Sequence, residues 1–161
     1  MAATKTHKNL DAIIPPDIIL VACGASMWLI TTYVARLPFA VPYRAVLAGG
    51  FMLGGLIIVF SAKMALRKHR TTERPDHHSL LKTAALVTSG PYAFSRNPIY
   101  LGMILLLIGW ALLLNNLLNL LVIVAFVISI TRLQIMPEEK MLGNLFGERY
   151  LRYKSQISRW I

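Results

Sequence analysis

Residues 99–130 read IYLGMILLLIGWALLLNNLLNLLVIVAFVISI, which is two apolar runs separated by the pair Asn115-Asn116. Neither run contains a charged residue. With the residues that flank them, the runs form segments 98–114 and 117–134, whose lengths of 17 and 18 residues lie at the lower end of what an α-helix needs to cross a hydrocarbon core of about 30 Å. In that core the backbone must pair its own polar groups, and an isolated apolar segment achieves this as a helix. Because the link between the runs is so short, the stretch predicts an antiparallel helical hairpin in a membrane.

Two further apolar segments precede the hairpin, and the whole chain is 56% hydrophobic and only 15% charged. We therefore expect an all-α polytopic membrane protein in which residues 1–161 form a single domain. The four predicted transmembrane helices are residues 18–35, 45–65, 98–114 and 117–134. A polar loop, residues 66–97, and an amphipathic tail, residues 137–161, complete this organisation.

The second predicted span contains the pair Gly50 and Gly54, spaced as Gly-x-x-x-Gly and accompanied by other small residues. Small residues at this spacing let two helix backbones approach closely in a membrane. We therefore expect these glycines to serve helix packing and not chemistry.

The formal net charge is +10, from 17 Lys and Arg against 7 Asp and Glu. The basic residues lie between the apolar runs and are not gathered on one face, so the pattern does not favour nucleic-acid binding. Two of them precede the first span, seven lie in residues 63–96, and six follow Ile130. Since Lys and Arg are enriched in cytoplasmic loops, both termini and the central loop are expected in the cytoplasm.

Several classes of site are not supported by the sequence. The single cysteine, Cys23, lies in an apolar run and is expected to be a small buried residue. The run Asp76-His77-His78 could suggest a metal, but adjacent histidines rarely face one ion, so solvated imidazoles are the preferred interpretation. No metal site is expected. The sequence also lacks a phosphate-binding glycine loop and a Ser/His/Asp arrangement.

A polar and aromatic segment, GPYAFSRNPIY at residues 90–100, directly precedes the hairpin. Asn97 before Pro98 is typical of a helix start, because asparagine caps helices and proline suits the first turn. The first turn leaves backbone N–H groups that can bind a ligand. A capped helix with a snorkelling Arg96 and interfacial tyrosines is the structural alternative.

The hairpin returns the chain to the same membrane face, where it continues into charged helices. Arg132 is followed by the pair Glu138-Glu139, and Gly147 separates two amphipathic segments. One cation and two anions at a helix end could bind a zwitterion, although such charges also complement helix dipoles. Together the two segments supply the candidate site residues Tyr92, Arg96, Asn97, Tyr100, Arg132, Glu138, Glu139, Arg149, Tyr150 and Tyr153.

The second half of the chain resembles a known family. The resemblance is carried by GPYAFSRNPIY and by the pattern Arg132-(five residues)-Glu138-Glu139-(six residues)-Phe146-Gly147-Glu-Arg-Tyr150-Leu-Arg-Tyr153. Both are similar to the isoprenylcysteine carboxyl methyltransferase family, and more broadly to a superfamily that includes membrane phospholipid N-methyltransferases. The family usually has Arg-His-Pro where this chain has Arg96-Asn97-Pro98.

The resemblance implies a cofactor, S-adenosylmethionine, bound outside any Rossmann fold. Residues at the methionine end of the cofactor would be Tyr92, Arg96, Asn97 and Tyr100, while Glu138 or Glu139 would bind the ribose hydroxyls. Arg132 would act in catalysis by orienting the carboxylate of the methyl acceptor. The acceptor-binding residues would be Arg149, Tyr150 and Tyr153.

The expected activity is S-adenosylmethionine-dependent methyl transfer to a lipophilic acceptor from the bilayer, by carboxyl O-methylation of the isoprenylcysteine type. Such a displacement requires alignment and dehydration more than a strong acid or base. A carboxylate acceptor needs no proton removed, whereas an amine or thiol does. A phospholipid amine and a small lipophilic thiol or amine remain alternative acceptors. A non-enzymatic membrane scaffold or transporter subunit is the alternative from another class.

Overall fold

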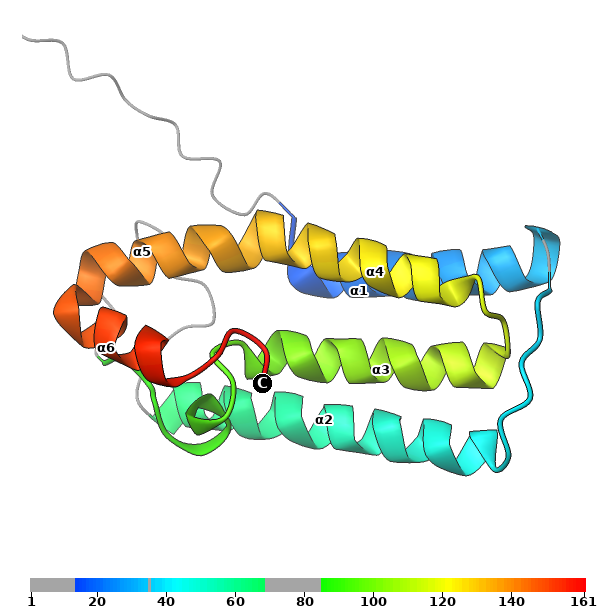
Figure 1. Cartoon of the computed structure of the whole chain (residues 1–161), viewed down its shortest axis with the longest axis horizontal. Helices are drawn as coiled ribbons and strands as arrows, with labels where there is room; N and C mark the ends of the chain where they lie inside the picture. Colours follow the sequence, from blue (N-terminus) through cyan, green and yellow to red (C-terminus); the bar gives the residue numbers. More distant parts are fainter. Residues whose placement is uncertain (1–13, 35, 69–84) are drawn as a thin grey trace, which may run out of the picture.

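The computed structural model describes residues 14–34, 36–68 and 85–161. Within these residues every regular element is a helix and no β-strand is present, which confirms the predicted all-α class (Figure 1). In the described part of the chain, three helices are long and apolar enough to cross a membrane: Pro16–Val34, Arg44–Lys68 and Asn119–Phe146. The apolar helix Pro98–Leu114 is shorter, with 17 residues. The chain is thus an integral membrane protein.

The first half of the chain supplies two long helices. α1 (Pro16–Leu29) starts with a proline in its first turn and continues into the π-helical turn η1 (Ile30–Val34). α2 spans Arg44–Lys68 and carries Arg67 and Lys68 in its last turn. These two cations complement the negative end of the helix dipole. α2 therefore ends in a basic turn at the end of the bundle where α3 begins (Figure 1).

α2 packs closely against α3 (Pro98–Leu114), and glycines make this possible. A Cβ on Gly102 would lie 2.7 Å from the carbonyl oxygen of Gly55, and one on Gly109 would lie 2.8 Å from that of Ala48. By contrast, a Cβ on Gly50 or Gly54 would meet nothing within 4 Å. The expectation that Gly50 and Gly54 form the close contact is therefore wrong for this chain, since the contact uses the other face of α2.

The turn between α3 and α4 (Asn119–Ile130) is held by asparagine side chains. Asn115 adopts the left-handed conformation at φ 51°, which asparagine tolerates better than most residues. The side-chain nitrogens of Asn116 and Asn119 donate to the hydroxyl of Thr31 at 3.3 and 3.2 Å. Asn116 also accepts from the backbone N–H of Leu37 at 3.3 Å. These bonds pair polar groups that would be costly to bury alone.

The helix after this turn does not stop at Pro137. α4 continues through the π-helical turn η4 (Thr131–Ile135) directly into α5 (Met136–Phe146). The amide of Met136 donates to the carbonyl of Thr131, five residues earlier. A proline has no N–H to donate and clashes with the previous turn of an α-helix. The wider π turn precedes Pro137, so the tail expected from residue 137 begins within a continuous helix and not at a break.

The remaining elements gather at one end of the bundle. Gly147, at φ 51°, separates α5 from α6 (Glu148–Gln156), and the short 3-10 helix η3 (Gly90–Ala93) precedes α3. Figure 1 shows α6, η3 and the start of α3 at the same end, with the last residues of the chain beside the start of α3. The two segments that carry the sequence motifs are therefore adjacent.

Candidate functional site

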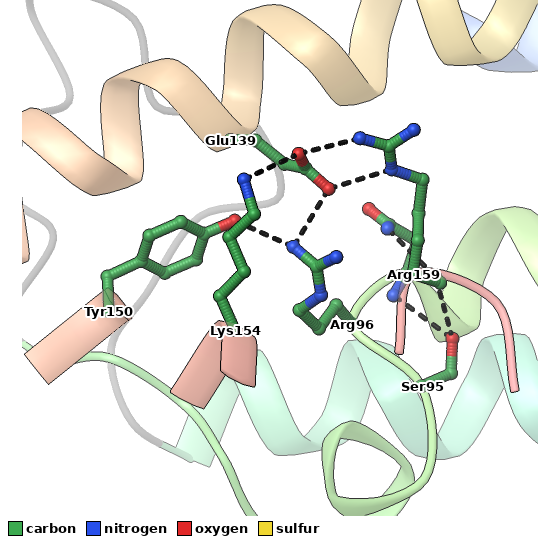
Figure 2. Close-up of polar contacts among 7 residues, drawn as sticks. Ser95, Arg96, Glu139, Tyr150, Lys154 and Arg159 are labelled. Carbon is green, nitrogen blue, oxygen red and sulfur yellow. Dashed lines mark hydrogen bonds and ion pairs between the residues drawn. The ribbon is translucent and has the colours of Figure 1, made fainter. Parts of the chain in front are cut away.

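The centre of the candidate site is the carboxylate of Glu139 on α5 (Figure 2). Arg96 Nη1 donates to Glu139 Oε1 at 2.9 Å. Arg159 donates from Nε to Oε1 and from Nη2 to Oε2, both at 2.9 Å. Lys154 Nζ lies 3.7 Å from Oε2. One carboxylate thus faces three cations, which leaves this cluster with an excess of positive charge.

Burial makes these interactions stronger than surface ion pairs. The side chains of Arg96 and Glu139 are only 9% and 10% exposed. Charges in such surroundings are less screened by solvent, and either one would be costly to leave unpaired. The pair therefore fixes the segment before α3 against α5.

A second contact joins the same two segments. The hydroxyl of Tyr100, in the first turn of α3, donates to Glu138 Oε1 at 2.7 Å. Tyr100 is buried and Glu138 is partly exposed. Both adjacent glutamates of α5 thus have partners in the segment around Asn97, one a cation and one a phenol.

Two tyrosines of α6 close the cluster on another side. Tyr150 accepts a hydrogen bond from Arg96 Nη1 at 3.3 Å, and Tyr153 donates to the carbonyl oxygen of Tyr92 at 2.7 Å. Burial raises the pKa of Tyr150, although the hydrogen bond from Arg96 opposes this shift. Burial raises the pKa of Tyr153 to about 12. Both phenols are consequently neutral at physiological pH.

Asn97 occupies the N-cap position of α3, but its side chain makes no capping bond. Its Nδ2 instead donates to the carbonyl oxygen of Arg159 at 3.0 Å. The expectation that Asn97 caps the helix is therefore correct for its position and wrong for its side chain. The amide joins the start of α3 to the residues after α6.

The structure does not join every candidate to this cluster. Arg132, in η4, and Arg149, on α6, are exposed, and neither side chain forms a hydrogen bond or ion pair with the described residues. The run Asp76-His77-His78 lies outside the described residues. Within the described part no group of three His, Cys, Asp or Glu could hold a metal.

Sequence reasoning missed three members of the cluster, which are Ser95, Lys154 and Arg159. Ser95 Oγ donates to the carbonyl oxygen of Arg159 at 3.3 Å. No motif or spacing pointed to Arg159, because its position depends on how the chain turns back after α6. Only the surplus of basic residues in the tail hinted at further cations near the glutamates.

A hollow of about 690 Å³ lies at the opposite end of the bundle. It is lined by residues between η1 and α2, by the first residues of α2 and by Asn115. Among the lining residues the only charged side chain is that of Arg44. The hollow is thus separate from the Glu139 cluster and does not contain the motif residues.

Comparisons with known proteins agree with this arrangement. The family model described as phospholipid methyltransferase matches residues 43–149, which is more than half of the chain. The chain belongs to the phospholipid methyltransferase family. The matched range includes both motif segments up to the start of α6. The family predicted from the motifs is thereby confirmed, and the chain is a membrane methyltransferase.

Two individual proteins are similar in sequence to this methyltransferase. Protein-S-isoprenylcysteine O-methyltransferase of Saccharomyces cerevisiae is 35% identical over 86 residues, which cover 53% of this chain and 34% of the yeast enzyme. An uncharacterized protein of Haemophilus influenzae is 40% identical over 62 residues, which cover 38% of this chain and 98% of that protein. No solved structure matches the methyltransferase.

The donors and acceptors of the cluster suit a methyl-donor cofactor of the S-adenosylmethionine type. The Nε atom of Arg96 is buried and has no hydrogen-bond partner among the described residues of the methyltransferase. A buried donor without a partner is costly, and a ligand carboxylate would satisfy it. The carboxylate of Glu138, which is partly exposed, is of the type that accepts bonds from ribose hydroxyls. The residues present therefore fit such a group.

Proposed function

We propose that this methyltransferase uses S-adenosylmethionine to methylate a lipophilic acceptor, and that the acceptor group is the carboxylate of an isoprenylated cysteine. The proposal depends mainly on two contacts. Both join residues near the start of α3 to the two glutamates of α5. Arg96 contacts Glu139, and Tyr100 contacts Glu138. The similarity to the yeast enzyme supports the acceptor.

S-adenosylmethionine, when bound, supplies a methyl group on a sulfonium, which a nucleophile can displace. The residues of the chain align it and exclude water. Arg96 would bind the carboxylate at the methionine end, because its Nε is buried and unpaired. Tyr92, Asn97 and Tyr100 would shape the same end of the site. Holding donor and acceptor in a fixed orientation is the main source of rate enhancement for such a displacement.

The contacts of the two glutamates support different roles for them in this proposal. Each oxygen of Glu139 already faces two cationic nitrogens, so it has little capacity for a further donor. Glu138 is partly exposed and accepts a hydrogen bond from the phenol of Tyr100. We therefore assign the ribose hydroxyls to Glu138 and an internal, charge-balancing role to Glu139.

The acceptor would meet the cofactor on the side of Arg132, which is exposed in η4 beside the membrane-spanning part of the helix. Its guanidinium would orient the acceptor carboxylate by a bidentate contact. Arg149 would assist from α6, and the rings of Tyr150 and Tyr153 would form the wall, since their hydroxyls already have partners. An acceptor carboxylate needs no general base, in agreement with this set of residues.

Four spans with both termini in the cytoplasm are part of the same proposal. The count includes α3, whose 17 residues extend over about 26 Å. In this topology the Glu139 cluster lies at the cytoplasmic headgroup level, where a soluble cofactor and a membrane-bound acceptor can meet. The orientation can be tested with a cysteine introduced at position 78. If a labelling reagent reaches this cysteine only from outside the cell, the proposed orientation is wrong.

The test has two parts. Purified protein in detergent is titrated with S-adenosylhomocysteine by calorimetry, and saturable binding is expected. Methyl transfer from radiolabelled S-adenosylmethionine is then measured with a farnesylated N-acetylcysteine, with the same molecule as its carboxamide, and with phosphatidylethanolamine. Labelling of the free acid alone supports the carboxylate acceptor. The family model's description favours a phospholipid as the second candidate, and labelling of phosphatidylethanolamine would establish it.

A further inference from the structure

The residues after α6 turn back and lie against the segment before α3. We call residues Ile157 to Trp160 the return segment. Three hydrogen bonds hold it: Arg96 N–H donates to the Ser158 carbonyl at 3.0 Å, and Ser95 Oγ and Asn97 Nδ2 donate to the Arg159 carbonyl at 3.3 and 3.0 Å. Trp160 also packs against the hydrophobic core. The return segment is thus a fixed part of the site.

This backbone arrangement places the side chain of Arg159 on Glu139. Its guanidinium contacts both carboxylate oxygens at 2.9 Å (Figure 2). Two parallel bonds between a guanidinium and a carboxylate define the plane of the carboxylate as well as its position. Lys154 is 46% exposed, and its Nζ lies 3.7 Å from Glu139 Oε2, so it fixes the plane and the position of the carboxylate less well. Arg159 is therefore the residue that orients Glu139.

Glu139 in turn positions Arg96. The Nη1 atom of Arg96 bonds to the same Oε1 atom that accepts from Arg159 Nε. Since Arg96 Nε is buried without a partner, the direction in which it points depends on where Nη1 is held. Tyr150 also accepts from Nη1, at 3.3 Å, but the bond to Glu139 is shorter and charged, so a turn of the Glu139 carboxylate would displace the guanidinium of Arg96.

We propose that Arg159 is a positioning residue of the cofactor site: it orients the carboxylate of Glu139 and, through it, the guanidinium of Arg96. The inference rests on the proposed function for the identity of the ligand. A different mechanism would make Arg159 a latch that occupies Glu139 and leaves when a ligand arrives. The three backbone-directed bonds and the packing of Trp160 favour a fixed role.

The two mechanisms give opposite results in a binding experiment with S-adenosylhomocysteine on the full-length protein. Arg159→Ala is expected to raise the Kd about tenfold or more, since bonds to charged groups are worth more than neutral ones. Arg159→Lys keeps the charge but not the two-bond geometry, and an intermediate Kd is expected. Arg152→Ala is the matched control, because it removes an exposed arginine of α6. Tighter binding by Arg159→Ala would establish the latch and overturn the proposal.

A double-mutant cycle tests whether Arg159 acts through Glu139. In a Glu139→Gln background Arg159→Ala should add less than about twofold to the Kd, because residues that act as one unit are not additive. If Arg159→Ala still raises the Kd tenfold in this background, Arg159 contacts the ligand directly or has a purely structural role. Either result would overturn the proposal. If Glu139→Gln does not fold, the ranking of Arg159→Lys between wild type and Arg159→Ala decides. Lack of binding by the wild-type protein would instead contradict the proposed function.

Discussion

Arg96 and Glu139 are 43 residues apart in the sequence, yet Arg96 Nη1 donates to Glu139 Oε1 at 2.9 Å and both side chains are at most 10% exposed. This pair joins the segment before α3 to α5, so it links the beginning of the hairpin to the helix that follows it. A buried pair is weak proof of net stabilisation, but removing one partner leaves an uncompensated buried charge. We therefore expect Glu139, which belongs to this pair, and its neighbour Glu138, which does not, to respond differently to substitution.

Glu139→Gln should destabilise the protein by roughly 3 kcal/mol, because Arg96 and Arg159 would lose their counter-charge. Glu138→Gln should lower the melting temperature less than Glu139→Gln does, since its side chain is more exposed and an amide oxygen can still accept from the phenol of Tyr100. It should nevertheless weaken binding of S-adenosylhomocysteine. Thermal unfolding in detergent and calorimetric titration measure the two effects. The assignment of roles fails if Glu138→Gln is the less stable variant.

The Asn97 side chain predicts how a histidine would behave at this position. Asn97 Nδ2 donates to the Arg159 carbonyl, and a histidine ring N–H can donate to the same oxygen. Asn97→His is thus expected to retain cofactor binding. Asn97→Asp should lose at least about tenfold in affinity, because an acceptor-only side chain would face a carbonyl oxygen. Equal binding by both variants would show that the bond to Arg159 is unimportant.

Tyr153 predicts a loss of stability at alkaline pH. Its pKa is raised from 10.0 to about 12 by burial, so the folded state holds the phenol proton more tightly than the unfolded state does. The resulting stabilisation is fully present below pH 10 and is lost as the pH rises towards 12. An absorbance titration should show that Tyr150 and Tyr153 ionise late among the six tyrosines, and Tyr153→Phe should remove the step near pH 12. A step near pH 12 that persists in Tyr153→Phe would assign it to another tyrosine.

The sequence was sufficient for the features that depend on local composition. The uncharged runs on either side of Asn115-Asn116 predicted helices, and the two motif segments were predicted to meet, as the bond between Arg96 and Glu139 shows. Periodicity could not tell which face of α2 meets α3, because both faces carry small residues. The choice of Gly55 over Gly54 follows from where Gly102 and Gly109 lie on α3.

The return segment illustrates a second limit of the sequence. Arg159 reaches Glu139 only because Gly147 turns the chain after α5 and the residues after α6 fold back on Ser95 and Asn97. Each of these steps is a tertiary contact between residues far apart in the chain. The sequence around Arg159 has no local pattern that predicts these contacts. Basic residues in an amphipathic tail are ordinarily interpreted as solvent-facing or headgroup-facing.

The contact between α2 and α3 predicts different effects of two glycine substitutions on stability. A Cβ at Gly102 would lie 2.6 Å from Val59 Cγ2 and 2.7 Å from the Gly55 carbonyl oxygen. Because backbone atoms cannot move aside as a flexible side chain can, Gly102→Ala should cost about 1–3 kcal/mol. Gly54→Ala meets nothing within 4 Å and should be neutral or slightly stabilising, since alanine favours helices. Thermal unfolding in detergent compares the two variants.

A clash between α2 and α3 should weaken cofactor binding more when it lies closer to the start of α3. Gly109→Ala makes a similar clash with the Ala48 carbonyl, but about 10 Å further from the start of the helix than Gly102→Ala. A shift of α3 at Gly102 would move Tyr100 and Asn97, whereas one at Gly109 would be absorbed near the Asn115 turn. Gly102→Ala should therefore raise the Kd for S-adenosylhomocysteine more than Gly109→Ala does at equal loss of stability. If both variants weaken binding equally, the helix moves as a rigid body and the site depends on the whole α2–α3 contact.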